Sequence, residues 1–398
     1  MRLFLFLLPW SSVSLTSCAA HKASEGTAQG HDGHDESADS DVSADDSGEG
    51  EPPDERDTGD AVADDPDPDP DVPVCWPGSE EEDRQAEVDA MVAAAQAFLD
   101  SLDDYQRGQV QYGLSDDERS DWSNLPHSVY IREGVSISEL SPERLDAAWA
   151  LITASLSAAG FTRAEAIMQM ENLLWEDGDM DAVPGKYFFT MFDVPSSNTP
   201  WGWQLDGHHL ALNFSVSGAE VTLAPSLWGT TPKTWLTGEH AGLTPMGPEE
   251  DLAFAWMESL DEEQRMLAQL GEGADPDLMA GPTSVQEEWP SSEGVPVTSL
   301  DADQRAAVLE WIEVYVGNLP PSQAAERMSV IEATLDDVSI AWMGGTRPGE
   351  MMYYRIQGSR VLIEFDHTQS ADHMHAVYRD PENDYGGDWL RKHLAEHH

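Results

Sequence analysis

Apolar residues recur along this chain with two periodicities, and each predicts a kind of secondary structure. Between residues 88 and 102, and again between 308 and 316, large apolar residues are spaced by three or four positions. This spacing places them on one face of an α-helix. Ser141-Pro142-Glu143 and Thr162-Arg163-Ala164-Glu165 carry capping residues and early acids, so we expect helices to begin there as well.

Other segments alternate apolar and polar residues with period two, which is typical of a half-buried strand. Residues 210–216 and 361–365 show this alternation. Segments 353–357 and 360–366 flank Gly358-Ser359, which predicts a hairpin with a two-residue turn; Asp206-Gly207 takes the equivalent place upstream. Helices followed by antiparallel strands indicate the α+β class.

Three pairs of segments resemble each other at a spacing of roughly 150 residues and occur in the same order. FLDSLDDYQR (98–107) resembles WMESLDEEQR (256–265), and LSPERLDAAWALI (140–152) resembles LDADQRAAVLEWI (300–312). WGWQLDGHHLALNF (201–214) resembles MYYRIQGSRVLIEF (352–365). We therefore expect two sequence-related halves, about 84–248 and 249–398, packed as one globular unit.

The N-terminal residues have the features of a secretion signal. Residues 1–18 begin with a single arginine, continue with an apolar run too short to span a bilayer, and end in Leu-Thr-Ser-Cys. This ending resembles the lipobox of bacterial lipoproteins, in which the cysteine, here Cys18, is lipidated. We therefore expect a lipid anchor in the cell envelope. Because alanine and not aspartate follows the cysteine, at Ala19, we expect this anchor at the outer membrane or cell surface. An ordinary signal peptide with a chance cysteine is the alternative.

Composition separates a linker from the folded part. Residues 19–74 lack aromatic residues, and between 23 and 74 they carry nineteen acidic residues and one arginine, so we expect a disordered acidic linker. Residues 75–398 are long enough for a large core. Cys75 is the only thiol after Cys18, so an internal disulfide is excluded. The net charge of −56 argues against nucleic acid as a partner.

Histidines and carboxylates concentrate in two places that suggest a metal site. On a strand, His373 and His375 would share one face, because successive side chains alternate. Histidine pairs of this kind bind zinc, copper or iron. We expect these two to act with one of His208, His209 or His367 and with a carboxylate from Asp366 or Glu364.

The upstream pair and the surrounding polar residues leave alternatives open. If residues 208 and 209 belong to a regular strand, their side chains point to opposite faces, and only one joins the centre. Arg379 could hold an anionic group of a substrate, while Asp380 and Asp384 could orient imidazoles or act in catalysis. A metal-free site using histidine as acid or base, or a purely structural network, would use the same residues.

These residues also resemble a known family. WSNLP, DGHHLALNF, YYRIQGSRVLIEFDHTQ and DHMHAVYRDPENDYGGDWLRKH, spread over about residues 86–393, are similar to the bacterial family called domain of unknown function 3500. The resemblance implies recurring positions at His208, His209, His373, His375, Arg379, Asp380, Asp384 and Gly386. His367 departs from the asparagine expected there, which weakens the case for this residue as a ligand. The family implies no established reaction.

Together these patterns predict a lipoprotein of the cell envelope with a divalent metal site. Zinc is favoured because it suits a mixed His/Asp site without a redox partner, and copper or iron are the alternatives. Hydrolysis of an unknown small-molecule or polymeric substrate is slightly favoured over oxidation. A lipoprotein that binds a ligand or metal without catalysis is the alternative function.

Overall fold

The computed structural model describes residues 78–274, 277–282, 284, 286–387 and 389. The signal peptide predicted for residues 1–18, the lipidation site Cys18, the acidic linker 19–74 and Cys75 lie outside the described residues. No helix within the described part is long and apolar enough to cross a membrane.

Eight α-helices occur among the described residues, and short polar residues cap several of them. The side chains of Asp103, Asp261 and Asp301 each accept a hydrogen bond from a backbone amide of the first helical turn, which satisfies a donor that has no partner within the helix. The helices are α1 (Glu81–Ser101), α2 (Asp104–Val110), α3 (Pro142–Ser155), α4 (Ala158–Asp177), α5 (Gly247–Ser259), α6 (Glu262–Ala268), α7 (Ala302–Val316) and α8 (Pro321–Ala333).

Two of the predicted helix starts can be compared with these bounds. α3 begins at Pro142 with Ser141 as its N-cap, as predicted. The start predicted at Thr162 is wrong, because α4 already begins at Ala158 with the Ser157 hydroxyl as its cap. Thr162 lies inside the helix, where its hydroxyl donates to the carbonyl of Ala158.

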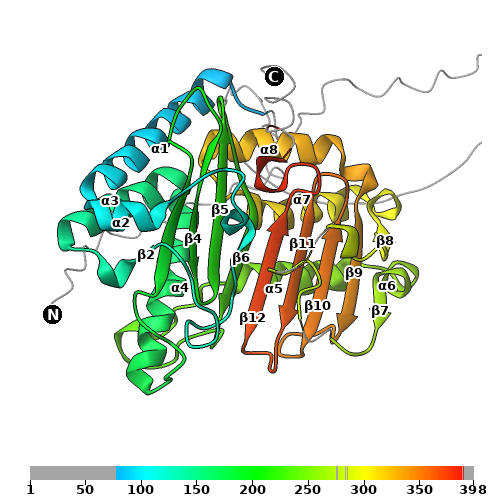
Figure 1. Ribbon diagram of the computed structural model, residues 1–398. Coiled ribbons are helices and arrows are strands. Elements are labelled where there is room, and N and C mark those ends of the chain that lie inside the picture. Colours follow the sequence, from blue (N-terminus) through cyan, green and yellow to red (C-terminus); the bar gives the residue numbers. More distant parts are fainter. Residues whose placement is uncertain (1–77, 275–276, 283, 285, 388, 390–398) are drawn as a thin grey trace, which may run out of the picture. The chain divides into compact units, whose positions relative to one another are not determined.

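Twelve strands form one mixed sheet, in the order β1-β3-β4-β5-β6-β12-β11-β10-β9-β7, with β2 beside β3 and β8 beside β9 (Figure 1). Only the short outer strands β1 and β7 pair in parallel. The α+β class predicted from the sequence is confirmed. The strands are β1 (Gln111–Tyr112), β2 (Val135–Ser136), β3 (Tyr187–Phe192), β4 (Trp201–Gly207), β5 (Leu210–Ser217), β6 (Glu220–Thr230), β7 (Gln269–Gly271), β8 (Val295–Pro296), β9 (Ser339–Gly344), β10 (Met352–Gln357), β11 (Leu362–His367) and β12 (Met374–Arg379).

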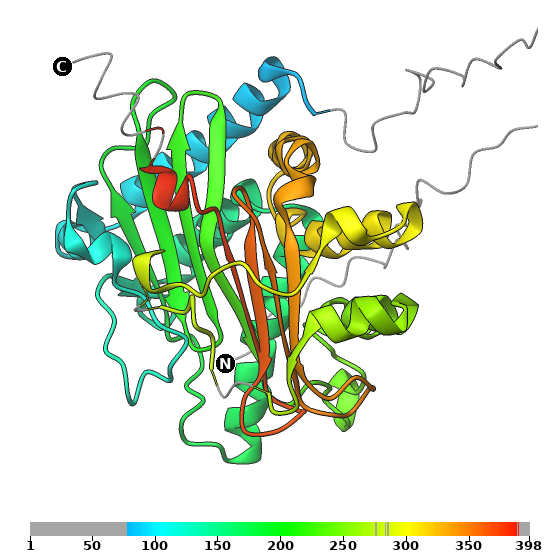
Figure 2. The same ribbon diagram turned by 90° about the vertical axis from the view of Figure 1, so that its right-hand side faces the viewer.

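The two faces of the sheet differ in chemistry because side chains alternate along each strand. One face carries large apolar residues, including Trp203, Phe214 and Phe365, and packs against the helices, which lie on that side of the sheet (Figures 1 and 2). The other face carries buried polar residues such as Asn213 and Glu364, together with a smaller apolar cluster that includes Trp122 from a covering loop. The polar face is where a site can be built.

The first and second halves of the chain meet where β6 pairs with β12. These strands are antiparallel, with Met374 opposite Thr230 and His375 opposite Gly229. The β4–β5 turn lies at the same end of the sheet, because Leu210 at the start of β5 pairs with Trp228 of β6. The junction therefore brings a turn from the first half beside the first residues of β12.

Both halves show the same succession of elements. Two helices, a short outer strand, a second short strand, two more helices and four antiparallel strands follow one another in residues 81–230 and again in residues 247–379. A shared order of elements is a likeness of topology alone, so an origin of the halves by duplication stays a prediction.

Candidate metal centre

His208 and His209 form the turn between β4 and β5. The turn has two residues, and His209 adopts a left-handed backbone conformation with φ of 62°. Two backbone hydrogen bonds hold it there: His209 N–H donates to the carbonyl of Asn124 (3.3 Å), and Gly229 N–H donates to the carbonyl of His209 (2.7 Å). The two histidines therefore do not lie on a regular strand, so the condition for opposite faces is not met, and the turn predicted at Asp206-Gly207 is wrong because both residues belong to β4.

The imidazoles of His209, His373 and His375 converge at the end of the sheet where the halves meet. Nε2 of His373 lies 3.0 Å from Nε2 of His209 and 3.1 Å from Nε2 of His375. His373 immediately precedes β12 and His375 is its second residue, and both rings turn Nε2 toward the same place. All three ligand atoms lie within 4.8 Å of one another.

These separations fit three ligands of one ion. Zinc–nitrogen bonds of about 2.0–2.1 Å put neighbouring ligand nitrogens about 3.3 Å apart in a tetrahedral set, and about 3.0 Å apart at right angles. Without an ion, neutral imidazoles in contact through Nε2 require one of the two nitrogens to carry a proton. Three rings that meet through their Nε2 atoms are better explained as ligands of one ion than as hydrogen-bonded neighbours.

A hydrogen-bond chain on the far side of His375 fixes which of its nitrogens is free. Nδ1 lies 3.2 Å from the hydroxyl of Thr368 and 3.6 Å from Oδ1 of Asp366. The Thr368 hydroxyl donates to the other oxygen of Asp366, so it accepts from Nδ1–H of His375. With the proton on Nδ1, the lone pair of Nε2 points into the cluster, as in carboxylate-oriented metal ligands.

The same series of hydrogen bonds shows where Asp366 lies, a residue that the sequence suggested as a ligand. Its carboxylate is fully buried and lies behind the His375 ring, not among the three Nε2 atoms. His367 points elsewhere: its Nδ1 accepts from the backbone amide of Met352 (3.0 Å). In this geometry Asp366 acts through Thr368 on His375.

His208 is adjacent to the cluster but is held by a different partner. Its Nδ1 lies 2.9 Å from a carboxylate oxygen of Glu171, a buried residue of α4. The His208 ring stacks on the His209 ring, with centroids 3.8 Å apart and planes 25° from parallel. The nitrogens of two stacked rings lie in nearly parallel planes and do not point at a common ion. His208 therefore packs against His209 and is not a fourth ligand beside it. Glu171, His208 and His209 nevertheless form a second group within ligand distance.

The electrostatic environment favours neutral imidazoles. Burial lowers the pKa of His373 to about 4, and His375 and His208 act in the same direction. Burial and the three neighbouring histidines hold the pKa of His209 well below its ordinary value. Neutral imidazole is the form that binds metal ions, so the lowered pKa values of His209 and His373 favour metal binding at neutral pH.

Space for the rings comes from a glycine. A Cβ at Gly229 would lie 2.9 Å from Cδ2 of His375 and 3.1 Å from Cδ2 of His209. Both contacts are closer than carbon atoms normally approach. Gly229 is thus the residue of β6 over which the two rings meet.

The family comparison matches residues 84–387 to the model described as a protein of unknown function, DUF3500. This chain belongs to the DUF3500 family. No curated protein and no solved structure matches it. All three converging histidines lie within the DUF3500 match, and the resemblance noted in the sequence is confirmed.

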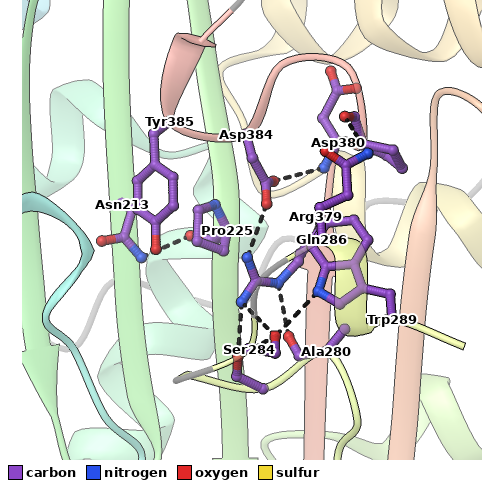
Figure 3. Close-up of polar contacts among 12 residues, drawn as sticks. Asn213, Pro225, Ala280, Ser284, Gln286, Trp289, Arg379, Asp380, Asp384 and Tyr385 are labelled. Atoms are coloured by element: carbon purple, nitrogen blue, oxygen red, sulfur yellow. Dashed lines mark hydrogen bonds and ion pairs between the residues drawn. The ribbon is translucent and has the colours of Figure 1, made fainter.

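The DUF3500 residues Arg379, Asp380 and Asp384 lie at the other end of β12. Arg379 lies four positions after His375, or about 13 Å along a strand. The Arg379 guanidinium donates to the carbonyls of Ala280 and Gly281 (2.7 Å each) and to Asp384 (2.9 Å), as Figure 3 shows for Ala280 and Asp384.

Through these bonds Arg379 links the sheet to the loop that contains Ala280 and Gly281. The guanidinium also lies over the rings of Trp122 and Trp289, at 5.8 and 5.0 Å from their centroids. Asp380 is buried and pairs with Arg327 at 2.7 Å. The structure therefore does not bring Arg379, Asp380 or Asp384 to the three imidazoles.

Sequence reasoning missed several residues around the centre. Asn124, Gly229 and Thr368 all contact the cluster, and Glu171 binds His208. Asn124 and Thr368 stand in segments quoted for the family resemblance, WSNLP and YYRIQGSRVLIEFDHTQ, but neither was assigned to the site. Glu171 could have been found from its place in the apolar stripe of its helix, because the residues three and four positions away, Ile167, Met168, Leu174 and Trp175, are all apolar.

Proposed function

We propose that this chain binds one divalent transition-metal ion through Nε2 of His209, His373 and His375. The observation that carries the proposal is the convergence of three Nε2 atoms, at 3.0 and 3.1 Å, from two parts of the chain more than 160 residues apart. Oriented Nδ1–H on His375 and neutral rings support it. Zinc is the favoured ion, because three imidazoles are a known zinc set, and copper or iron remain alternatives.

We further propose a hydrolytic role. Three protein ligands leave a coordination position open, and a bound ion supplies there a water with a pKa near ~7. His373 is partly exposed, whereas His209 and His375 are buried, so the cluster opens to solvent on the His373 side. The chain itself would contribute the rigid ligand frame, made of a backbone-bonded turn and a strand fixed in the middle of the sheet.

The location of this activity follows from the sequence alone and is also a proposal. Residues 1–18 and Cys18 support a lipid-anchored protein of the cell envelope, with the acidic segment as a tether. The folded part would then work outside the cytoplasmic membrane on a substrate that is not nucleic acid.

Elemental analysis of the chain from residue 19 onward, purified without added metal-binding tags, tests the ion. We expect about one metal ion per chain, and its loss in His209→Ala, His373→Ala and His375→Ala. His240→Ala is the matched control, because His240 is partly exposed and contacts only Glu239 among the described acidic residues. Wild-type protein that binds no zinc, copper or iron at micromolar concentration would refute the metal site.

The reaction class needs a separate measurement. The metal-loaded protein should hydrolyse at least one ester, amide or phosphoester in a panel of chromogenic substrates, and removal of the metal by a chelator should abolish turnover. Stoichiometric metal without turnover on any of the three bond types would favour a binding protein over a hydrolase.

A further inference from the structure

Among the described polar side chains of the loops over the polar face, Asn124, in the loop that carries Trp122, reaches the Nε2 side of a site imidazole. Its amide nitrogen Nδ2 lies 3.5 Å from Nε2 of His375. An amide NH₂ group can only donate, and the proton of His375 lies on Nδ1, so the amide N–H faces the Nε2 lone pair. The side chain is half-buried, which leaves it accessible to a small ligand entering from solvent.

The backbone of Asn124 is fixed on both sides. Its own carbonyl accepts from the amide of His209 at 3.3 Å. The buried guanidinium of Arg132 donates to the carbonyls of Ser123 and of Leu125, the latter at 2.8 Å. Arg132 in turn pairs with buried Asp206 of β4 at 2.9 Å. A donor held in this way loses little freedom when it binds a ligand.

We propose that Asn124 donates a hydrogen bond to the oxygen ligand at the open position of the metal and is a catalytic residue of this centre. The ligand is an oxygen that carries or develops negative charge: a metal-bound hydroxide, or the carbonyl, carboxylate or phosphoryl oxygen of a substrate. Fixed N–H donors directed at such an oxygen stabilise the charge that forms on it, because they do not need to reorient. The inference rests on the proposed function, since it requires an ion at the three imidazoles.

The contacts distinguish Asn124 from the other polar neighbours of the cluster. Thr368 and Asp366 contact His375 on the Nδ1 side, away from the three converging Nε2 atoms. Glu171 contacts His208 and not a Nε2 atom of the three ligands. Only Asn124 combines a donor group, contact on the Nε2 side and partial exposure among the described side chains that contact the cluster.

The test uses the chain from residue 19 onward loaded with Co²⁺, titrated with sodium azide and followed by the visible absorption of the cobalt. Azide is a small anion that binds an open metal position and accepts hydrogen bonds. Loss of a hydrogen bond to a charged ligand weakens binding about tenfold or more. We therefore expect Asn124→Ala to bind one Co²⁺ as tightly as wild type, and to bind azide at least about tenfold more weakly.

The control is Asn172→Ala, whose amide bonds Gln169 on the same helix and should leave azide affinity unchanged. Equal azide affinity in Asn124→Ala and wild type would overturn the inference, and so would loss of Co²⁺ from Asn124→Ala, which would mean that the residue holds the ligands. If the alanine variant does not fold, the near-isosteric Asn124→Leu gives the same readout. Absence of Co²⁺ binding in the wild type would instead refute the metal site itself.

Discussion

Replacing Gly229 by alanine tests the geometry of the centre with a single methyl group. The new Cβ would lie 2.9 Å from Cδ2 of His375 and 3.1 Å from Cδ2 of His209, whereas ordinary contact begins at 3.4 Å. The two rings must therefore retreat by about 0.3–0.5 Å. Since Cδ2 is bonded to Nε2, each ligand atom moves with its ring.

This displacement is large on the scale of metal coordination, where ligand distances hold to about 0.2 Å. We expect the affinity of Gly229→Ala for zinc to fall at least about tenfold, or ~1.4 kcal/mol. The crowding also costs stability, by about 1–3 kcal/mol as in other overpacked cores, because the backbone carbonyl of Met374 lies 3.1 Å from the new Cβ.

Competition with a chromophoric zinc chelator measures the affinity, and thermal unfolding of the chelator-treated protein measures the stability. Gly108→Ala is the control, because a Cβ at Gly108 in α2 meets no atom within 4 Å. It should keep wild-type zinc affinity and gain stability slightly. Zinc affinity in Gly229→Ala within twofold of wild type would show that the two rings do not act together as ligands.

Two further predictions concern the covering loops. Burial and the repulsion of Asp121 and Glu133 raise the pKa of Glu118 to about 7. The stability from this group is therefore present below pH ~4.5 and lost as pH rises through ~7. Glu118→Gln should raise the melting temperature at pH 8 more than at pH 5, and an equal change at both pH values would contradict this. Arg379→Lys should lower the free energy of unfolding by about 2–4 kcal/mol, because lysine cannot replace the bonds to two carbonyls and Asp384. The metal content of this variant should be unchanged. Loss of metal would place Arg379 in the centre.

The part of the centre that could be predicted from the sequence depended on local periodicity. Alternation along a strand was enough to place His373 and His375 on one side, and their Nε2 atoms do lie together. The two upstream histidines were harder, because the nearby turn signal Asp206-Gly207 belongs to β4 and neither turn position is glycine, asparagine or proline. His209 holds its left-handed conformation through bonds to Asn124 and Gly229, which are distant in sequence.

The sequence could suggest that the histidines converge, but it could not establish it. Convergence requires β6 to pair with β12 in a register that sets His375 opposite Gly229, and nothing local specifies this pairing over almost 150 residues. The roles first considered for Arg379 and Asp384 were wrong because these residues lie too far along the chain from His375 to reach the three imidazoles. Charge and hydrogen-bonding capacity identified them as important, yet their partners lie in the loop around Ala280.

The seam between β6 and β12 has a consequence for how the molecule matures. One of the three converging imidazoles comes from the turn before β6, and two come from the start of β12 and the residue before it, so neither portion alone presents the complete set. An ion held there would bridge β12 and a turn made long before it. Loading would therefore report that the whole chain has assembled, and would fasten its C-terminal strands in place by mass action.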